Sequence, residues 1–129
     1  MIERNKRIKD PLTYKPRTSK YSPNLPWLDV VKFVIKELKE YGQEPGLVDL
    51  TDALVNEFGL DYSTLFERDE HGEIKLHYYI RFCMYDARDY FGLTMGKAAR
   101  YLTNKGEEFY NVKDDLNNFT DFLFWWMQY

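Results

Sequence analysis

Two arginines seven residues apart are the side chains of this sequence best placed to bind an anion. Arg81 and Arg88 lie in a stretch whose apolar residues recur every three or four positions, so both fall on one polar helical face, about two turns apart. Guanidinium groups placed in this way can bind phosphate oxygens, or the O6 and N7 edge of guanine, through paired hydrogen bonds. The alternative is that they pair with neighbouring acids such as Asp86 and Asp89 on a solvated face, where an ion pair contributes only about 0–1 kcal/mol.

Other polar side chains extend this predicted binding face. Tyrosine hydroxyls can donate to phosphates, and a face that is merely hydrated has no need of exposed tyrosines. Two further cations follow at a turn expected later in the chain. The residues predicted to contact DNA are therefore Lys75, His77, Tyr78, Arg81, Tyr85, Arg88, Lys97 and Arg100.

Two groupings of titratable residues could support catalysis or metal binding, but their spacing argues against it. Glu73 and Lys75, with Asp61 twelve residues before Glu73, match a loose nuclease pattern in which carboxylates hold a divalent cation. That chemistry needs Glu-x-Lys on a strand, whereas here it precedes a helix. His71 and His77 lack the tight spacing of a zinc site. We therefore expect no catalytic residue, no metal, no cofactor and no enzymatic activity.

Charge is distributed unevenly along the chain. The 129 residues carry a net charge of −3, of which residues 1–20 contribute +5 and the remaining residues −8. Because residues 1–24 contain three prolines and no apolar periodicity, we predict a flexible basic arm. Such an arm can neutralise phosphates independently of the body, or serve only as a solvated tail. The arm residues predicted to contact DNA are Arg4, Lys6, Arg7 and Lys9.

Apolar periodicity predicts three long helices in the first three quarters of the chain. The first spans 27–41, the second extends from Asp49 as its N-cap to residue 58, and the third spans 76–91. A change of period then predicts a β-hairpin across 93–102, followed by a helical turn capped by Thr103. The stripe expected to be buried on the third helix is Leu76, Ile80, Cys83, Ala87 and Phe91.

The last predicted element is an aromatic helix over 114–129, within a C-terminal segment of residues 111–129. It is apolar on nearly all sides, so it has more apolar surface than one packed face can bury. One face would cover the chain's own core and the other a second copy, in a symmetric dimer. The alternative is a helix folded across its own core with two rings left exposed. The residues predicted to form the dimer interface are Phe119, Phe122, Leu123, Trp125 and Trp126.

The order of these elements resembles a winged helix-turn-helix domain. Residues 86–93 resemble the end of a recognition helix that enters the wing, and residues 101–109 resemble the strand-to-helix exit that follows a wing. We predict a winged-helix domain over residues 25–110. With Leu25 and Pro26 opening the first helix, residues 25–109 resemble the N-terminal DNA-binding domain of Mrr-type restriction proteins. The resemblance implies that the third helix enters the major groove. The nuclease half of those proteins is absent, so no cleavage is expected.

Composition sets further limits on the fold and the environment. Aromatic residues make up 18% of the chain, which argues against a wholly disordered protein. No apolar run approaches the roughly 20 residues that span a bilayer, so we expect no membrane partner. The single cysteine, Cys83, cannot form an internal disulfide and suits the cytoplasm. The expected fold is mainly α with a small β-hairpin, a winged helix with an additional C-terminal helix.

These observations favour a non-catalytic protein that binds duplex DNA as a homodimer. The third helix would lie in the groove, and the basic arm would contact phosphates. A different class of function stays open, because the body is acidic and the wing carries few basic residues. In that alternative the winged-helix scaffold would bind another protein, as an adaptor or inhibitor of the kind found in phages and mobile elements.

Overall fold

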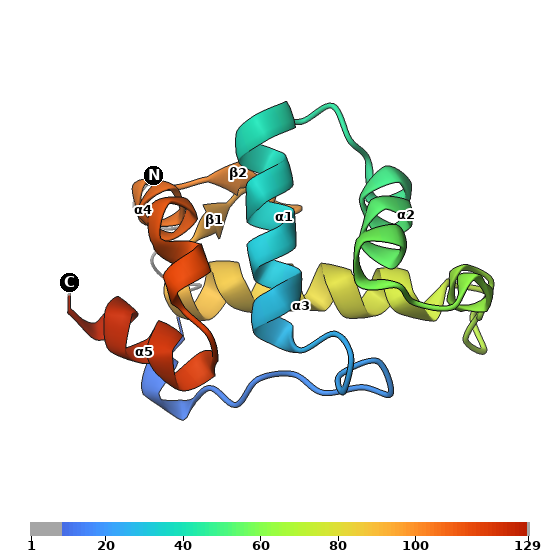
Figure 1. Cartoon of the computed structure of the whole chain (residues 1–129), viewed down its shortest axis with the longest axis horizontal. Helices are drawn as coiled ribbons and strands as arrows, with labels where there is room; N and C mark the ends of the chain where they lie inside the picture. The colour runs from blue at the N-terminus through green and yellow to red at the C-terminus, as the bar shows by residue number, and fades with distance from the viewer. Residues whose placement is uncertain (1–8, 129) are drawn as a thin grey trace.

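The computed structural model describes residues 9–128, which are mainly helical with one two-stranded antiparallel hairpin (Figure 1). This confirms the predicted mixture of α-helices and a small hairpin. No helix in the described part of the chain is long and apolar enough to cross a membrane. The elements are η2 (Pro11–Thr13), α1 (Trp27–Tyr41), α2 (Leu47–Phe58), η3 (Tyr62–Leu65), α3 (Lys75–Phe91), β1 (Thr94–Met95), β2 (Tyr101–Leu102), α4 (Asn104–Val112), η4 (Lys113–Asp115) and α5 (Phe119–Met127), where η denotes a 3₁₀ turn.

Helix α1 lies at the centre of the fold, where it crosses α3 and also packs on α4 (Figure 1). It begins after Pro26, a residue that favours a helix start because it lacks a backbone donor and has a fixed φ. Its bounds confirm the prediction. Its apolar stripe is almost completely buried, as shown by Val30, Val31, Val34, Ile35 and Leu38.

Helix α2 begins two residues before the predicted N-cap. Gly46 is the N-cap, and Asp49 is the third helical residue. The Asp49 carboxylate accepts a hydrogen bond from the Gly46 backbone N–H at 3.3 Å, so its negative charge still lies at the positive end of the helix. The prediction of an acidic first turn is confirmed, but Asp49 is the third residue of the helix and not its N-cap.

The hairpin joins α3 to α4 through a close backbone approach. Thr94 pairs with Leu102 and Met95 with Tyr101. The Thr103 side chain accepts a hydrogen bond from the Gly106 N–H at 3.0 Å, which confirms Thr103 as the cap of α4. A Cβ at position 106 would lie 2.1 Å from the carbonyl oxygen of Leu93, so only glycine fits there.

The C-terminal helix begins later than predicted. Residues 113–115 form η4, and Leu116 is extended and buried. Asn118 then caps α5 by accepting a hydrogen bond from the Asp121 N–H at 2.9 Å. An N-cap residue has a non-helical backbone, so Asn118 interrupts any helix that would run through it. This explains why one long helix over 114–129 does not form. The break lets α5 turn back across the core, where Phe122 is fully buried.

Candidate nucleic-acid interface

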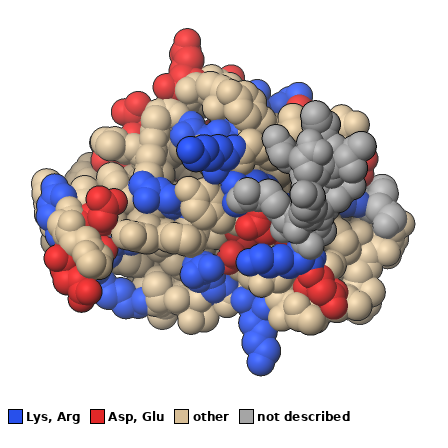
Figure 2. All heavy atoms as spheres, turned by 180° about the vertical axis from the view of Figure 1, so that it is seen from behind, with Lys and Arg blue, Asp and Glu red and all other residues tan. Residues whose placement is uncertain are grey.

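The outer face of α3 carries the predicted contact residues. The predicted core stripe of this helix is at most 2% exposed throughout, so the side chains half a turn away must face outward. Helix α3 lies behind α1 in Figure 1, and Figure 2 views the molecule from that side. Lys and Arg side chains are spread over this face, with Asp and Glu between them. The partly exposed residues of α3 include His77, Tyr78, Arg81, Phe82 and Tyr85, and Lys75 is exposed.

Three rings on this face form what we call the aromatic ridge: Tyr78, Phe82 and Tyr85. Tyr78 and Phe82 are stacked, with ring centroids 5.3 Å apart and an interplanar angle of 5°. Tyr85 meets Phe82 edge to face at the same centroid distance. Each ring lies under one guanidinium, at 4.9–5.7 Å from the ring centroid. These cations are Arg17 over Phe82, Arg81 over Tyr78 and Arg88 over Tyr85.

Arg88 fixes the hairpin to α3. Its guanidinium donates to the carboxylate of Asp89 at 2.7 and 3.3 Å, and to the carbonyls of Gly96 and Lys97 at 3.0 Å each. Its side chain is only 11% exposed. Arg88 therefore pairs with a neighbouring acid, as the alternative interpretation of the sequence stated. Its position gives no support to the prediction that Arg88 contacts DNA.

Arg81 has a different environment. Within residues 9–128 its guanidinium makes no hydrogen bond or ion pair, and it lies over the Tyr78 ring, 5.7 Å from the ring centroid. Burial lowers the pKa of neighbouring His77, and the positive charge of Arg81 lowers that pKa further. His77 is therefore held neutral near pH 7, and Arg81 provides the charge of this part of the helix. Its donors can bind an anion without first breaking an ion pair.

The two hairpin cations also differ from each other. Lys97 lies exposed in the turn between β1 and β2, as the prediction requires. Arg100 is half-buried and donates to the carbonyl of Pro45, and burial lowers its pKa. Its own carbonyl accepts a hydrogen bond from the side chain of Gln43. Arg100 thus joins the hairpin to the connection between α1 and α2, so its position does not support DNA contact.

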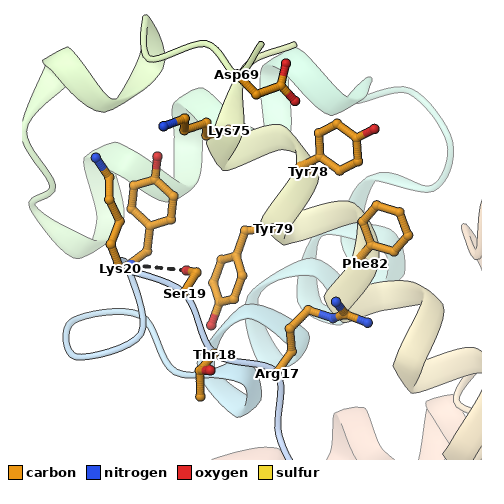
Figure 3. Close-up of a pocket in the computed structure, with 10 residues that line it drawn as sticks. Arg17, Thr18, Ser19, Lys20, Asp69, Lys75, Tyr78, Tyr79 and Phe82 are labelled. Atoms are coloured by element: carbon orange, nitrogen blue, oxygen red, sulfur yellow. Dashed lines mark hydrogen bonds between the residues drawn. The ribbon is translucent and has the colours of Figure 1, made fainter. Parts of the chain in front are cut away.

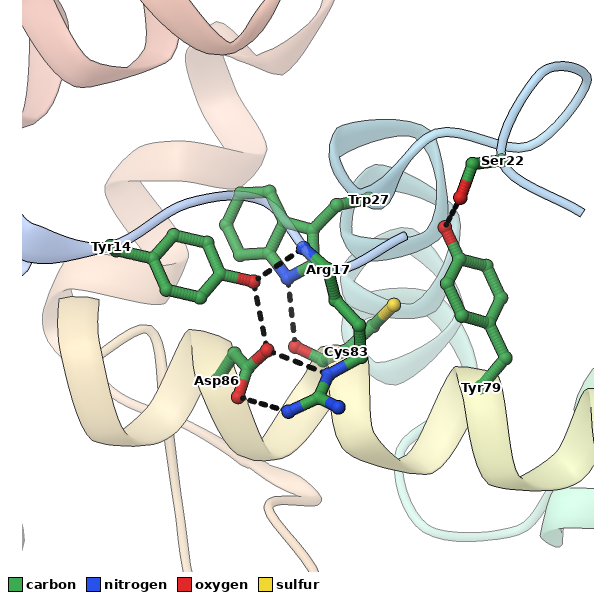
Figure 4. Close-up of polar contacts among 7 residues, drawn as sticks. All are labelled: Tyr14, Arg17, Ser22, Trp27, Tyr79, Cys83 and Asp86. Atoms are coloured by element: carbon green, nitrogen blue, oxygen red, sulfur yellow. Dashed lines mark hydrogen bonds and ion pairs between the residues drawn. The ribbon is translucent and has the colours of Figure 1, made fainter. Parts of the chain in front are cut away.

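The segment 9–24 is packed on α3, and the prediction of a flexible arm is wrong for these residues. Tyr14, Arg17 and Asp86 form what we call the clasp (Figure 4). The Tyr14 hydroxyl donates to the Asp86 carboxylate at 2.8 Å, and the Arg17 guanidinium donates to it at 3.0 and 3.2 Å. Burial, followed by the hydrogen bond to Asp86, raises the pKa of Tyr14. The Tyr14 side chain is 9% exposed, so the segment contributes to the core.

Further contacts hold both ends of this segment. The Lys9 backbone N–H donates to the carbonyl of Asp89 at 2.6 Å, and the Lys9 ammonium lies 5.4 Å from the centre of the Tyr90 ring. The Tyr21 hydroxyl donates to Glu67 at 2.8 Å. The other arm residues predicted to contact DNA, Arg4, Lys6 and Arg7, lie outside the described residues.

The side chains predicted to form a dimer interface pack within a single chain. Phe122 is fully buried, and the Trp126 indole N–H donates to the carbonyl of Phe91 at 2.9 Å. The other three, Phe119, Leu123 and Trp125, are partly buried against the same core. The homodimer remains a prediction, and on α5 its largest exposed apolar side chains would be Phe124 and Met127.

The two weaker groupings show no built site. Asp61 caps η3 by accepting a hydrogen bond from the Ser63 N–H at 2.9 Å, while Glu73 and His71 lie exposed in the loop before α3. Within residues 9–128, no three His, Cys, Asp or Glu side chains are grouped closely enough to hold a metal ion. Neither the nuclease pattern nor the histidine pair gains support from this geometry.

Comparison with known proteins adds no relative from which a role could be inferred. No protein-family model matches the chain, and no curated protein or solved structure is significantly similar to it. The winged helix-turn-helix assignment and the resemblance to Mrr-type restriction proteins therefore stay predictions. The evidence for a function has to come from the contacts of the chain's own side chains.

Proposed function

We propose that the protein is a winged helix-turn-helix domain that binds duplex DNA and has no catalytic role. The element order supports this proposal, because three helices are followed by a two-stranded hairpin and a further helix. The single observation that carries it is Arg81, a partly exposed guanidinium on the outer face of the third helix that has no acidic partner among residues 9–128. A cation of this kind on a helix that can enter a groove suits a phosphate or a guanine edge.

The remaining residues take different roles in this proposal. Tyr78 and Tyr85 present hydroxyls beside Arg81, and Lys75 and Lys97 supply exposed ammonium groups at the start of α3 and in the hairpin turn. These four would contact phosphates, which set the orientation of a protein on DNA. Arg88 and Arg100 would act indirectly, because they fix the hairpin against the helices.

The test is a fluorescence-polarisation titration of duplex DNA at two ionic strengths. Arg81→Ala is expected to weaken binding by about tenfold or more, as the loss of a bidentate contact does. Lys39→Ala is the matched control, because Lys39 pairs with Glu107 at 2.7 Å on another part of the surface. The control should bind like the wild type. Absence of binding at low salt, or equal affinity of Arg81→Ala and the wild type, would overturn the proposal.

A protein-binding adaptor is a second candidate, favoured by two exposed apolar side chains outside α3. Tyr62 is 65% exposed and Phe66 is 74% exposed, at and just after η3. Exposed rings of this kind often mark protein interfaces. If the wild type recovers a stoichiometric protein partner that Phe66→Ser fails to recover, and neither binds duplex DNA, the adaptor function replaces the first proposal.

A further inference from the structure

A hollow of about 460 Å³ lies between residues 17–21 and the first half of α3 (Figure 3). Its volume is within the range of small-molecule sites. Its lining includes three cations and four aromatic residues: Arg17, Lys20, Lys75, Tyr21, Tyr78, Tyr79 and Phe82. The hollow exists because the clasp holds the N-terminal segment against the helix, so it could not be anticipated from a flexible arm.

The charges around the hollow favour an anion. Figure 3 shows Lys20 and Lys75 at one end, and Arg17, whose charge is paired with Asp86, beside Phe82 at the other. The Lys75 ammonium makes no hydrogen bond or ion pair within residues 9–128. The Lys20 ammonium pairs with Glu67 at 2.7 Å in an exposed setting and lies 5.6 Å from the centroid of the Tyr21 ring. An exposed pair of this kind is exchanged at little cost. Two neighbouring ammonium groups match the charge of a phosphate better than that of a single carboxylate.

The one carboxylate in the lining is already occupied. Asp69 accepts hydrogen bonds from the backbone N–H groups of His71 at 2.8 Å and Glu73 at 3.0 Å. These bonds hold it in its own loop and lower its pKa. Asp69 therefore serves the turn before α3, and it forms no ion pair with the Lys75 ammonium within residues 9–128.

The rings give the hollow firm apolar walls. Tyr79 is 5% exposed and its hydroxyl donates to the carbonyl of Leu25 at 2.8 Å, so the ring cannot turn away. Tyr78 and Phe82 hold each other by stacking. Rigid aromatic walls beside cations suit a flat, conjugated ligand that carries a phosphate.

We infer that this hollow is a binding site for a nucleoside phosphate. The base would pack against the rings of Tyr78, Tyr79 and Phe82, and the phosphate would lie between Lys20 and Lys75. The ligand could be a free mononucleotide or one nucleotide unstacked from a strand, since both have the same chemistry. This site shares Lys75 and Tyr78 with the proposed duplex contact, whereas Lys20 and Tyr79 belong to this site alone, so the two proposals can be tested separately.

The test is an NMR titration of the full chain with adenosine monophosphate, with the single-stranded hexanucleotide of deoxyadenosine, and with adenosine. We expect the ring signals of Tyr78 and Phe82 to shift with a dissociation constant below about 1 mM, and adenosine to bind about tenfold more weakly than the monophosphate. Lys20→Ala combined with Lys75→Ala should weaken binding about tenfold. Lys15→Ala is the matched control, an exposed lysine of the same segment outside the lining, and should bind like the wild type.

The outcomes separate the two ligand sources. Binding of the monophosphate, with the expected response to the lysine variants, identifies a free nucleotide as a sufficient ligand, whereas binding of the hexanucleotide alone identifies a strand. The inference is overturned if neither ligand shifts the ring signals at about 1 mM, or if a folded double variant binds as the wild type does. Arg81→Ala should keep nucleotide binding while it weakens duplex binding, so either proposal can fail without the other.

Discussion

Replacing Asp86 by alanine is expected to destabilise the protein by about 2–3 kcal/mol, because the Tyr14 hydroxyl and the Arg17 guanidinium would lose the carboxylate to which both donate. Tyr14 is 9% exposed, so its hydroxyl would keep the hydrogen bond from the Arg17 backbone N–H but would be a buried donor without an acceptor, which costs about 1–3 kcal/mol. The Arg17 side chain is 42% exposed and can return to water, so its ion pair contributes only about 0–1 kcal/mol. For a chain of this length the change corresponds to a fall of about 10 °C in Tm.

The assay is urea unfolding followed by tryptophan fluorescence, because Trp27 lies in the core beside the Tyr14 ring, with centroids 5.3 Å apart. Asp86→Asn is the matched control, since it keeps the shape and an acceptor oxygen for Tyr14 and removes only the charge. It should cost about 1 kcal/mol. A double-mutant cycle of Tyr14→Phe with Asp86→Ala should give a coupling energy of about 1–2 kcal/mol.

Hydrogen exchange at Lys9 shows whether the segment itself is released. Its backbone N–H is bonded to the carbonyl of Asp89 at 2.6 Å, so it should exchange slowly in the wild type and faster in Asp86→Ala. If Asp86→Ala unfolds within about 0.5 kcal/mol of the wild type and the Lys9 amide stays equally protected, the clasp does not hold the segment. The hollow of Figure 3 would then have no fixed wall.

Two further predictions concern close packing and pH. Gly106→Ala should cost about 3 kcal/mol in urea unfolding, because its Cβ would lie 2.1 Å from a backbone oxygen. Gly46→Ala has open space around it and should cost about 1 kcal/mol or less, because alanine is a poorer N-cap than glycine. Equal effects would contradict the observed approach of α4 to the hairpin. Stability should be full below pH 10 and fall above it, by about 1.4 kcal/mol per buried tyrosine at pH 11, because the unfolded chain loses protons that the folded chain keeps. The tyrosines concerned are Tyr14, Tyr21 and Tyr79. Burial raises the pKa of each of them, that of Tyr79 to about 12. Tyrosinate absorbance measures this, and ionisation of all eleven tyrosines near pH 10 in the folded protein would refute it.

Local signals predicted most of the fold. The apolar period of α1 and α3 reflects their packing on one core, and Thr103 caps α4 within its own turn. The starts of α2 and α5 were harder to place, because several polar residues compete to cap each helix. Gly46 and Asn118 are the caps in the structure, while the nearby aspartates lie in or before the first turn.

The docking of residues 9–24 has no comparable local signal. Its contacts join residues far apart in the chain, such as Tyr14 and Asp86, so they follow no helical or strand period. The prolines and the positive charge favoured a flexible arm, although the segment contains two aromatic side chains, Tyr14 and Tyr21, that are buried in the structure. Two rings seven residues apart in an otherwise polar segment are the signal that favours docking, since an exposed tail gains nothing from them.

The aromatic ridge shows why residue type alone could not separate a binding arginine from a structural one. Arg17, Arg81 and Arg88 each lie over one ring of the ridge, yet two of them are neutralised by carboxylates. Adjacent side chains on a helix usually point apart, but the Arg88 guanidinium, lying over the Tyr85 ring, still reaches the next residue, Asp89. The positions three and four residues from Arg81 on either side hold no acid, so its charge has no partner along the helix. That difference in helical neighbours was present in the sequence, and it selects Arg81 as the cation whose removal should weaken DNA binding.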